Sequence, residues 1–121
     1  MIETIIFDFG DVFINLNKSK LEKKLKKIGL TEWNEDLKNL NEGYETGKYR
    51  ESEFFLGIQK YTPETELYII RRAWNSIIGD FPKNRLEFLE NIVPKYKLIL
   101  LSNTDATHID VVERELGKDF Y

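Results

Sequence analysis

Two short stretches of the chain place polar side chains directly after runs of apolar residues. Asp8 and Asp11 follow the apolar start of "IIFDFGDVFINL", and Ser102 and Asn103 follow that of "YKLILLS". An aspartate is ionised at neutral pH, so Asp8 needs no general base to act as a nucleophile. A serine does need one, and Ser102 lacks the GxSxG turn of serine hydrolases. We therefore assign the Ser102 hydroxyl to hydrogen bonding with an anionic oxygen, assisted by the amides of Asn103 and Thr104 as the next helix begins.

An attack by Asp8 on a phosphate group would need a cation beside it. Two unit charges of like sign repel by about 4 kcal/mol at ~4 Å in an effective dielectric of ~20. Mg²⁺ would offset this repulsion, because it accepts carboxylate and carbonyl oxygens while it contacts phosphate oxygens. The candidate magnesium ligands are the Asp8 carboxylate and the backbone carbonyl of Gly10.

Both apolar runs have the pattern of strands in a parallel sheet. Residues 2–9 and 96–102 are apolar at successive positions and rich in β-branched, aromatic or aliphatic types, which favours strands covered on both faces. Ligands of open parallel sheets bind beyond the carboxyl ends of the strands. If the two strands are neighbours, Asp8 and Ser102 face the same pocket.

The residues between these strands have helical spacing. Four helices joined by short links are expected, at about residues 17–29, 33–43, 52–61 and 62–79. The fourth has the clearest signals, with Thr62 as its cap, Pro63 at its first position and Gly79 at its end. The first is capped by Asn17 or Ser19.

Further helices are expected at residues 83–92 and from 106 to about 116. A sheet of only two strands leaves the backbone N–H and C=O groups of both outer edges unpaired. We therefore predict an α/β fold with a partial Rossmann-like parallel sheet core, interrupted by a four-helix cap. The core comprises residues 1–15 and 82–121, and the cap comprises residues 16–81.

The composition is typical of a folded globular protein, with 41% hydrophobic and 32% charged residues and a net charge of -3. The absence of cysteine excludes disulfides and thiolate metal sites and favours a cytoplasmic location. The lysine cluster "KSKLEKKLKKIG" has no aromatic or glycine-rich platform beside it, so no nucleic-acid partner is expected. The chain shows neither a signal peptide nor a run long enough to span a bilayer, so no membrane partner is expected.

The segments "IIFDFGDVFINL" and "LILLSNTDATH" resemble motifs one and two of the haloacid dehalogenase-like (HAD) hydrolase superfamily. "NEGYETGKYRESEFF" and "AWNSIIGDFPKNRLEFLE" are similar to the cap and post-cap segments of its α-D-glucose-1-phosphate phosphatases. The resemblance implies a C1-type cap and a Mg²⁺-dependent phosphatase of a small phosphorylated metabolite. It also implies that Asp8 forms an aspartyl-phosphate intermediate, that Ser102 and Asn103 bind the phosphate, and that Asp8 and Gly10 hold Mg²⁺.

The sequence departs from the family pattern at two points. The usual motif DxDx(T/V) has a second aspartate that acts as the catalytic acid, whereas Gly10 stands at that position here. Asp11 lies one residue further on and is our candidate for the acid, although neighbouring side chains point in different directions. The third and fourth motifs of the family, a lysine and an acidic pair, are not found before Tyr121. We therefore expect a truncated, amino-terminal portion with little or no turnover alone.

Two alternatives stay open. A dehalogenase would use the same aspartate to attack carbon and would need no metal. A non-catalytic module could use its exposed sheet edge to form a homodimer.

Some other residues could contact a substrate. The cap-side candidates are Tyr44, Glu45, Lys48 and Arg72, but their spacing does not decide whether they line the pocket. His108 is more typical of a surface or capping residue, and Trp33 and Trp74 are expected in the core of the helical bundle.

Overall fold

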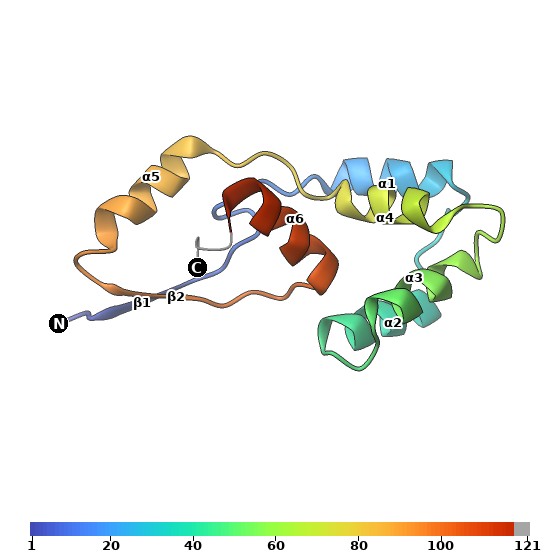
Figure 1. Ribbon diagram of the computed structural model, residues 1–121, viewed down its shortest axis with the longest axis horizontal. Coiled ribbons are helices and arrows are strands. Elements are labelled where there is room, and N and C mark those ends of the chain that lie inside the picture. The colour runs from blue at the N-terminus through green and yellow to red at the C-terminus, as the bar shows by residue number, and fades with distance from the viewer. Residues whose placement is uncertain (118–121) are drawn as a thin grey trace. The chain divides into compact units, whose positions relative to one another are not determined.

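The computed structural model describes residues 1–117, which form two strands and six helices (Figure 1). In chain order these are β1 (Thr4–Phe7), α1 (Lys18–Lys27), α2 (Glu35–Glu45), α3 (Glu51–Gln59), α4 (Leu67–Asn75), α5 (Lys83–Ile92), β2 (Lys97–Leu100) and α6 (Ala106–Leu116). The predicted α/β class with a parallel sheet is confirmed.

The chain divides by its contacts into two compact units. The sheet unit comprises Met1–Leu16 and Ile78–Asn103, and the helical unit comprises Asn17–Ile77 together with residues 104–117. This grouping differs from the predicted core, residues 82–121, because α6 packs with α4 and belongs to the helical unit. Whether the two units mark the core and the cap stays a prediction.

The sheet unit is built on a parallel pair of short strands. Phe7 of β1 stands opposite Leu100 of β2, and the Leu101 N–H donates to the Phe7 carbonyl at 2.8 Å. The prediction that both faces are covered is wrong for the described residues. Among them β1 and β2 are the only strands, α5 has no buried residue, and Ile6 and Leu101 are 61% and 70% exposed.

The loop after β1 forms the small core of the sheet unit. Phe9, Phe13 and Ile14 are buried, and the Phe13 ring meets that of Phe7 edge to face at 5.1 Å. The Phe9 carbonyl accepts the N–H groups of Phe13 at 2.9 Å and Val12 at 3.1 Å, which forms one tight turn. The apolar side chains thus anchor the loop that carries the predicted site.

The sheet-unit segments that lead into residue 17 and follow residue 77 pair with each other. Leu16 and Ile78 form an antiparallel bridge, and the Gly79 N–H donates to the Asn15 carbonyl at 2.7 Å. A Cβ atom on Gly79 would lie 2.4 Å from that carbonyl oxygen. Glycine is therefore needed here for a close approach of two backbones.

The fourth predicted helix is shorter than expected at both ends. It begins at Leu67 and ends at Asn75, so Thr62 is not its cap and Gly79 is not its end. Thr62 instead is buried, and its carbonyl accepts the Thr65 N–H at 2.9 Å in a separate turn. The predicted start was wrong because the cap-and-proline signal of that turn resembles a helix start.

The helical unit has one apolar core, to which α1, α2, α3 and α4 contribute. Phe54, Leu37, Ile58 and Ile70 are its most deeply buried large side chains. Trp74 is buried there as predicted, and its indole stacks on that of Trp33 at 5.8 Å. None of the helices in residues 1–117 is both long enough and apolar enough to cross a membrane.

The start of the first helix follows its cap signal, but the end of the second helix differs from the prediction. The Asn17 side chain accepts the Lys20 N–H at 3.0 Å, which confirms this residue as the cap of α1. Helix α2 continues through Gly43 to Glu45, so the predicted end at Gly43 was wrong. A Cβ atom on Gly43 would lie 2.3 Å from the ring of Tyr49, so this glycine makes room for an aromatic ring.

Candidate active site

The parallel register brings Asp8 and Ser102 to the same edge of the sheet. Each follows the last paired residues of its strand, since Leu101 donates to Phe7. Asp8 is exposed, and its Oδ1 accepts the Phe9 N–H at 2.7 Å. Among residues 1–117, neither Asp8 Oδ2 nor the Ser102 hydroxyl has a hydrogen-bond partner. The carboxylate and the hydroxyl are therefore both available to a ligand.

The backbone after Asp8 offers a second oxygen donor. Within the described range, the carbonyl of Gly10 accepts no backbone hydrogen bond. The same residues contain no group of three or more acidic or histidine side chains placed to hold a metal. Carboxylate and carbonyl oxygens are donors that suit Mg²⁺, which keeps several waters and is bound through one or two carboxylates plus substrate phosphate. The chemical type of the Asp8 and Gly10 oxygens therefore suits Mg²⁺.

Asp11 has a structural partner. Its backbone is left-handed, with φ of 60°, a conformation that Asp tolerates better than most residues. Its Oδ1 accepts the Leu16 N–H at 2.9 Å, and its own N–H donates to the Ile14 carbonyl at 2.6 Å. The carboxylate thus closes the loop after β1, and its predicted role as catalytic acid stays a prediction.

The residues after Ser102 differ from the expected helix start. Asn103 is exposed, and α6 begins only at Ala106, with Asp105 as its N-cap. The amides of Asn103 and Thr104 therefore lie before the helix starts. None of the described residues accepts a hydrogen bond from either amide. They remain available to an anion as backbone donors, but without the first turn of a helix directly behind them.

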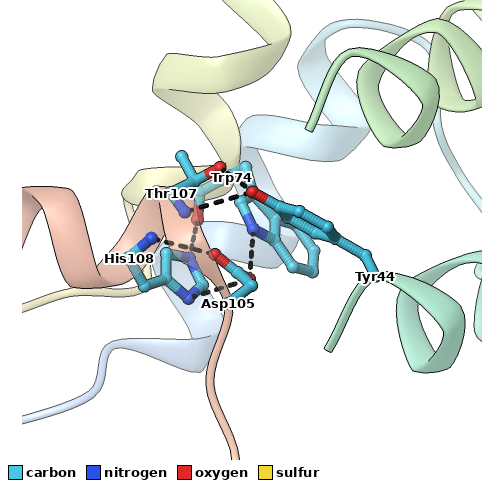
Figure 2. Close-up of polar contacts among 5 residues, drawn as sticks. All are labelled: Tyr44, Trp74, Asp105, Thr107 and His108. Atoms are coloured by element: carbon cyan, nitrogen blue, oxygen red, sulfur yellow. Dashed lines mark hydrogen bonds and ion pairs between the residues drawn. The ribbon is translucent and has the colours of Figure 1, made fainter. Parts of the chain in front are cut away.

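Figure 2 shows five side chains that meet in the helical unit around the start of α6, which we call the Asp105 cluster: Tyr44, Trp74, Asp105, Thr107 and His108. Asp105 is buried, and its two carboxylate oxygens have different partners. Oδ1 accepts the His108 N–H at 2.9 Å, and Oδ2 accepts the Trp74 Nε1–H at 3.1 Å. One carboxylate thus caps α6 and binds α4.

Tyr44 of α2 holds the same turn from another side. Its hydroxyl accepts the Thr107 N–H at 3.1 Å and lies 2.7 Å from Thr107 Oγ1. Burial raises the pKa of Tyr44, although the hydrogen bond with Thr107 lowers it, and the negative charge of Asp105 contributes to the rise. The phenol is therefore protonated at neutral pH and has a proton to donate.

The His108 ring is held against Trp74. The two rings stack at 5.3 Å with 10° between their planes. His108 Nδ1 lies 3.4 Å from Asp105 Oδ2, and Nε2 lies 3.3 Å from the Trp74 carbonyl oxygen. Glu45 follows Tyr44, and desolvation raises the pKa of its carboxyl, to which the charge of Asp105 adds. Asp105 was not predicted as a functional or capping residue, although an Asp just before a helical segment is a typical N-cap.

Comparison with known proteins identified one curated relative at significant similarity. The chain is 26% identical over 116 residues to D-ribitol-5-phosphate phosphatase from Bacteroides thetaiotaomicron. The match covers 87% of this chain and 54% of that protein. The chain thus spans about half the length of the curated relative that it matches. No family model matches.

Solved structures share the fold. A HAD family enzyme from Bacteroides thetaiotaomicron, in complex with magnesium and inorganic phosphate, superposes with a TM-score of 0.86 at 32% identity and covers 94% of this chain and 59% of its own. A predicted HAD-like family hydrolase from Porphyromonas gingivalis gives a TM-score of 0.80 at 29% identity, over 92% of this chain and 56% of its own. These matches extend over both units of the chain.

Proposed function

We propose that this chain, as a member of the haloacid dehalogenase-like (HAD) hydrolase superfamily, is part of a magnesium-dependent phosphatase that acts on a small phosphorylated metabolite. The chain carries the nucleophile and the phosphate-binding residues of that enzyme. The observation that supports this most directly is the parallel register, in which Asp8 directly follows Phe7 of β1 and Ser102 directly follows Leu101, whose N–H donates to Phe7. An ionised nucleophile and a free hydroxyl donor then lie at one sheet edge.

The proposed reaction has two steps. An oxygen of Asp8 attacks phosphorus, an Asp8 O–P bond forms, and the bond between phosphorus and the leaving oxygen breaks. Ser102 donates its hydroxyl proton in a hydrogen bond to a phosphate oxygen, and the amides of Asn103 and Thr104 supply further donors. Water then attacks phosphorus, the Asp8 O–P bond breaks, and phosphate leaves with the water oxygen. One water proton passes to the acid that protonated the leaving oxygen, and the Asp8 carboxylate is restored.

Mg²⁺ would be held by the Asp8 carboxylate and the Gly10 carbonyl. When bound, it would reduce the charge repulsion between the nucleophile and the phosphate. The magnesium and phosphate complex of the related enzyme supports this choice of cation and ligand. The dehalogenase alternative has no comparable support, since the curated relative is named a phosphatase.

The leaving oxygen also needs a proton. Gly10 has no side chain to donate a proton, which leaves Asp11 as the acid that we propose. Its Oδ1 accepts a hydrogen bond from Leu16, so only Oδ2 is free to carry a proton to the leaving oxygen. The phosphorylated polyol named for the curated relative is the first substrate to test.

The experiment is a phosphorylation assay that does not require a full turnover. The chain is incubated with Mg²⁺ and a small acyl phosphate, and intact mass spectrometry detects the addition of one phosphoryl group. We expect incorporation into the wild type and none into Asp8→Asn, whose amide is a poor nucleophile.

Two controls accompany it. Asp11→Asn keeps an oxygen that can accept from Leu16 and should still be phosphorylated, because an acyl phosphate has a good leaving group. EDTA should abolish incorporation. Equal incorporation into the wild type and Asp8→Asn would contradict the proposal.

A further inference from the structure

The direction of the Gly10 carbonyl is fixed by the peptide group to which it belongs. A trans peptide group is planar, so its carbonyl and the N–H of the next residue point in opposite directions. No peptide bond in residues 1–117 is cis. The Asp11 N–H donates to the Ile14 carbonyl at 2.6 Å. The Gly10 carbonyl, in the same peptide group, therefore points away from the Ile14 carbonyl as long as that bond is kept.

The peptide group before Gly10 is held as well. The Phe9 carbonyl accepts the N–H groups of Val12 at 3.1 Å, Phe13 at 2.9 Å and Ile14 at 3.4 Å. The side chains of Phe9, Phe13 and Ile14 are buried, so this turn is anchored in the small core of the sheet unit. Gly10 thus lies between two peptide groups that are both held by hydrogen bonds.

The side chain of Asp11 binds this turn to the segment that follows it. Its Oδ1 accepts the Leu16 N–H at 2.9 Å. The Leu16 side chain lies against Gly10, since a Cβ atom on Gly10 would come 2.8 Å from Leu16 Cδ1. Leu16 in turn forms the antiparallel bridge with Ile78. Asp11 therefore joins the peptide group that carries the Gly10 carbonyl to a paired segment of the same unit.

The backbone at position 11 restricts which residue types can make this connection. Its φ is 60°, a left-handed conformation that glycine adopts most easily and that asparagine and aspartate tolerate. Glycine would keep the conformation but has no acceptor for the Leu16 amide. Aspartate and asparagine can both keep the conformation and hold that amide.

We propose that Asp11 is a positioning residue for the Gly10 carbonyl, the backbone oxygen that we assign to Mg²⁺. It acts through its bond to Leu16, which keeps the peptide group between Gly10 and Asp11 in one orientation. This inference rests on the proposed function, because that function supplies the cation. Positioning needs only an acceptor at Oδ1, whereas proton donation would need a carboxyl group and would use Oδ2.

The first test compares two variants that both lose the charge of Asp11. Asp11→Asn keeps an oxygen for the Leu16 amide, whereas Asp11→Gly keeps only the backbone conformation. Mn²⁺ serves as a paramagnetic probe of the oxygen ligands, and broadening of the Asp8 and Gly10 amide NMR signals gives its dissociation constant. We expect Asp11→Gly to bind Mn²⁺ roughly ten-fold more weakly than Asp11→Asn, as loss of a residue that orients a metal ligand often does.

Asp8→Asn separates this inference from the proposed function. It should weaken Mn²⁺ binding, because it removes the charge of a direct ligand. Unchanged binding in Asp8→Asn, or no broadening in the wild type, would contradict the proposed magnesium site. Weaker binding in Asp8→Asn with equal binding in Asp11→Gly and Asp11→Asn would overturn the positioning role alone. Urea unfolding verifies that each variant is folded.

The second test uses the wild-type chain and so needs no variant to fold. If the bond between Leu16 and Asp11 favours cation binding, the bound cation must favour that bond to the same degree. Saturating Mg²⁺ should therefore slow hydrogen exchange at the Leu16 amide roughly ten-fold. Leu37 is the matched control, since its N–H also donates to a side-chain oxygen, that of Asn34, at 2.9 Å. Its exchange should not change. An equal effect of Mg²⁺ on the two amides would overturn the positioning role.

Discussion

Asp8 and Asp11 lie close together in the sequence but have different surroundings. Asp8 keeps one carboxylate oxygen without a partner in the described chain, whereas Asp11 uses an oxygen to hold the Leu16 amide. A nucleophile needs a free oxygen to attack the substrate, whereas a residue that anchors a loop keeps its oxygen in a hydrogen bond. The geometry therefore supports Asp8 as the reacting group and gives Asp11 a structural task in addition to the acid role that we propose.

The structural task of Asp11 can be tested by stability. Asp11→Ala removes the bond to Leu16 and places alanine at φ of 60°, which together should cost about 2 kcal/mol of the free energy of unfolding. Asp11→Asn keeps an acceptor and tolerates the left-handed backbone, so it should lose much less. Urea unfolding curves of the three proteins measure the difference. An Asp11→Ala protein as stable as the wild type would contradict the anchoring role.

At the scale of elements, the pairing of the connecting segments depends on Gly79. Gly79→Ala would place Cβ 2.4 Å from the Asn15 carbonyl oxygen, so one backbone must move. We expect a loss of about 1–3 kcal/mol in the free energy of unfolding. Gly57→Ala is the control, since its Cβ would meet only the flexible Leu40 side chain and α3 would gain helix propensity. Chemical denaturation should therefore show Gly79→Ala well below Gly57→Ala in stability.

The contact of Tyr44 in α2 with α6 should make the stability of the protein depend on pH. The pKa of Tyr44 in the folded state is raised above 10.0, chiefly by burial. The contribution of the protonated phenol to the free energy of unfolding is therefore fully present below pH 10.0 and is lost as the pH rises through the pKa of the folded state. Tyr44→Phe removes this titration and also leaves the Thr107 amide without its acceptor, which should cost about 1–2 kcal/mol at neutral pH.

The stability difference between wild type and Tyr44→Phe should therefore narrow above pH 10.0. Thermal unfolding at several pH values measures it. Tyr68→Phe, at an exposed tyrosine, serves as the control and should leave the difference from wild type near zero at neutral pH. A gap between wild type and Tyr44→Phe that widens in alkali would contradict the assigned role of the phenol.

Some elements could be predicted because their signals are local. Asn17 caps α1 through its own side chain, and the apolar run before Asp8 forms a strand from its own residues. The start of α4 was predicted wrongly because the local turn at Thr62 has the same signal as a helix start. The role of Gly43 could not be predicted, because it depends on where the fold places the Tyr49 ring. Asp105 has a local signal as the N-cap of α6, but its bond to Trp74 could not be predicted, since Trp74 lies far away in the sequence.

At the scale of the whole molecule, exposed apolar side chains on the sheet predict self-association. In the described part of the chain Ile6 is 61% exposed on β1, and both strands have a free edge. We expect light scattering to show dimers of this chain at high concentration. Ile6→Lys should reduce them, whereas Leu56→Lys, at an exposed position on α3, should not. A stable monomer at every concentration would contradict this prediction.

The bridge between Leu16 and Ile78 has a consequence for protein engineering. Because the helical segment leaves and re-enters the sheet unit at paired residues, a short turn could replace residues 17–77 without stretching the remaining backbone. The same junction would accept a helical segment grafted from another member of the superfamily. In this chain the Trp74 indole donates a hydrogen bond to Asp105, the N-cap of α6. A graft would keep this bond only if it supplied an indole or another donor for Asp105. A replacement for residues 17–77 must therefore fit the paired residues at both of its ends and must also supply a donor to Asp105.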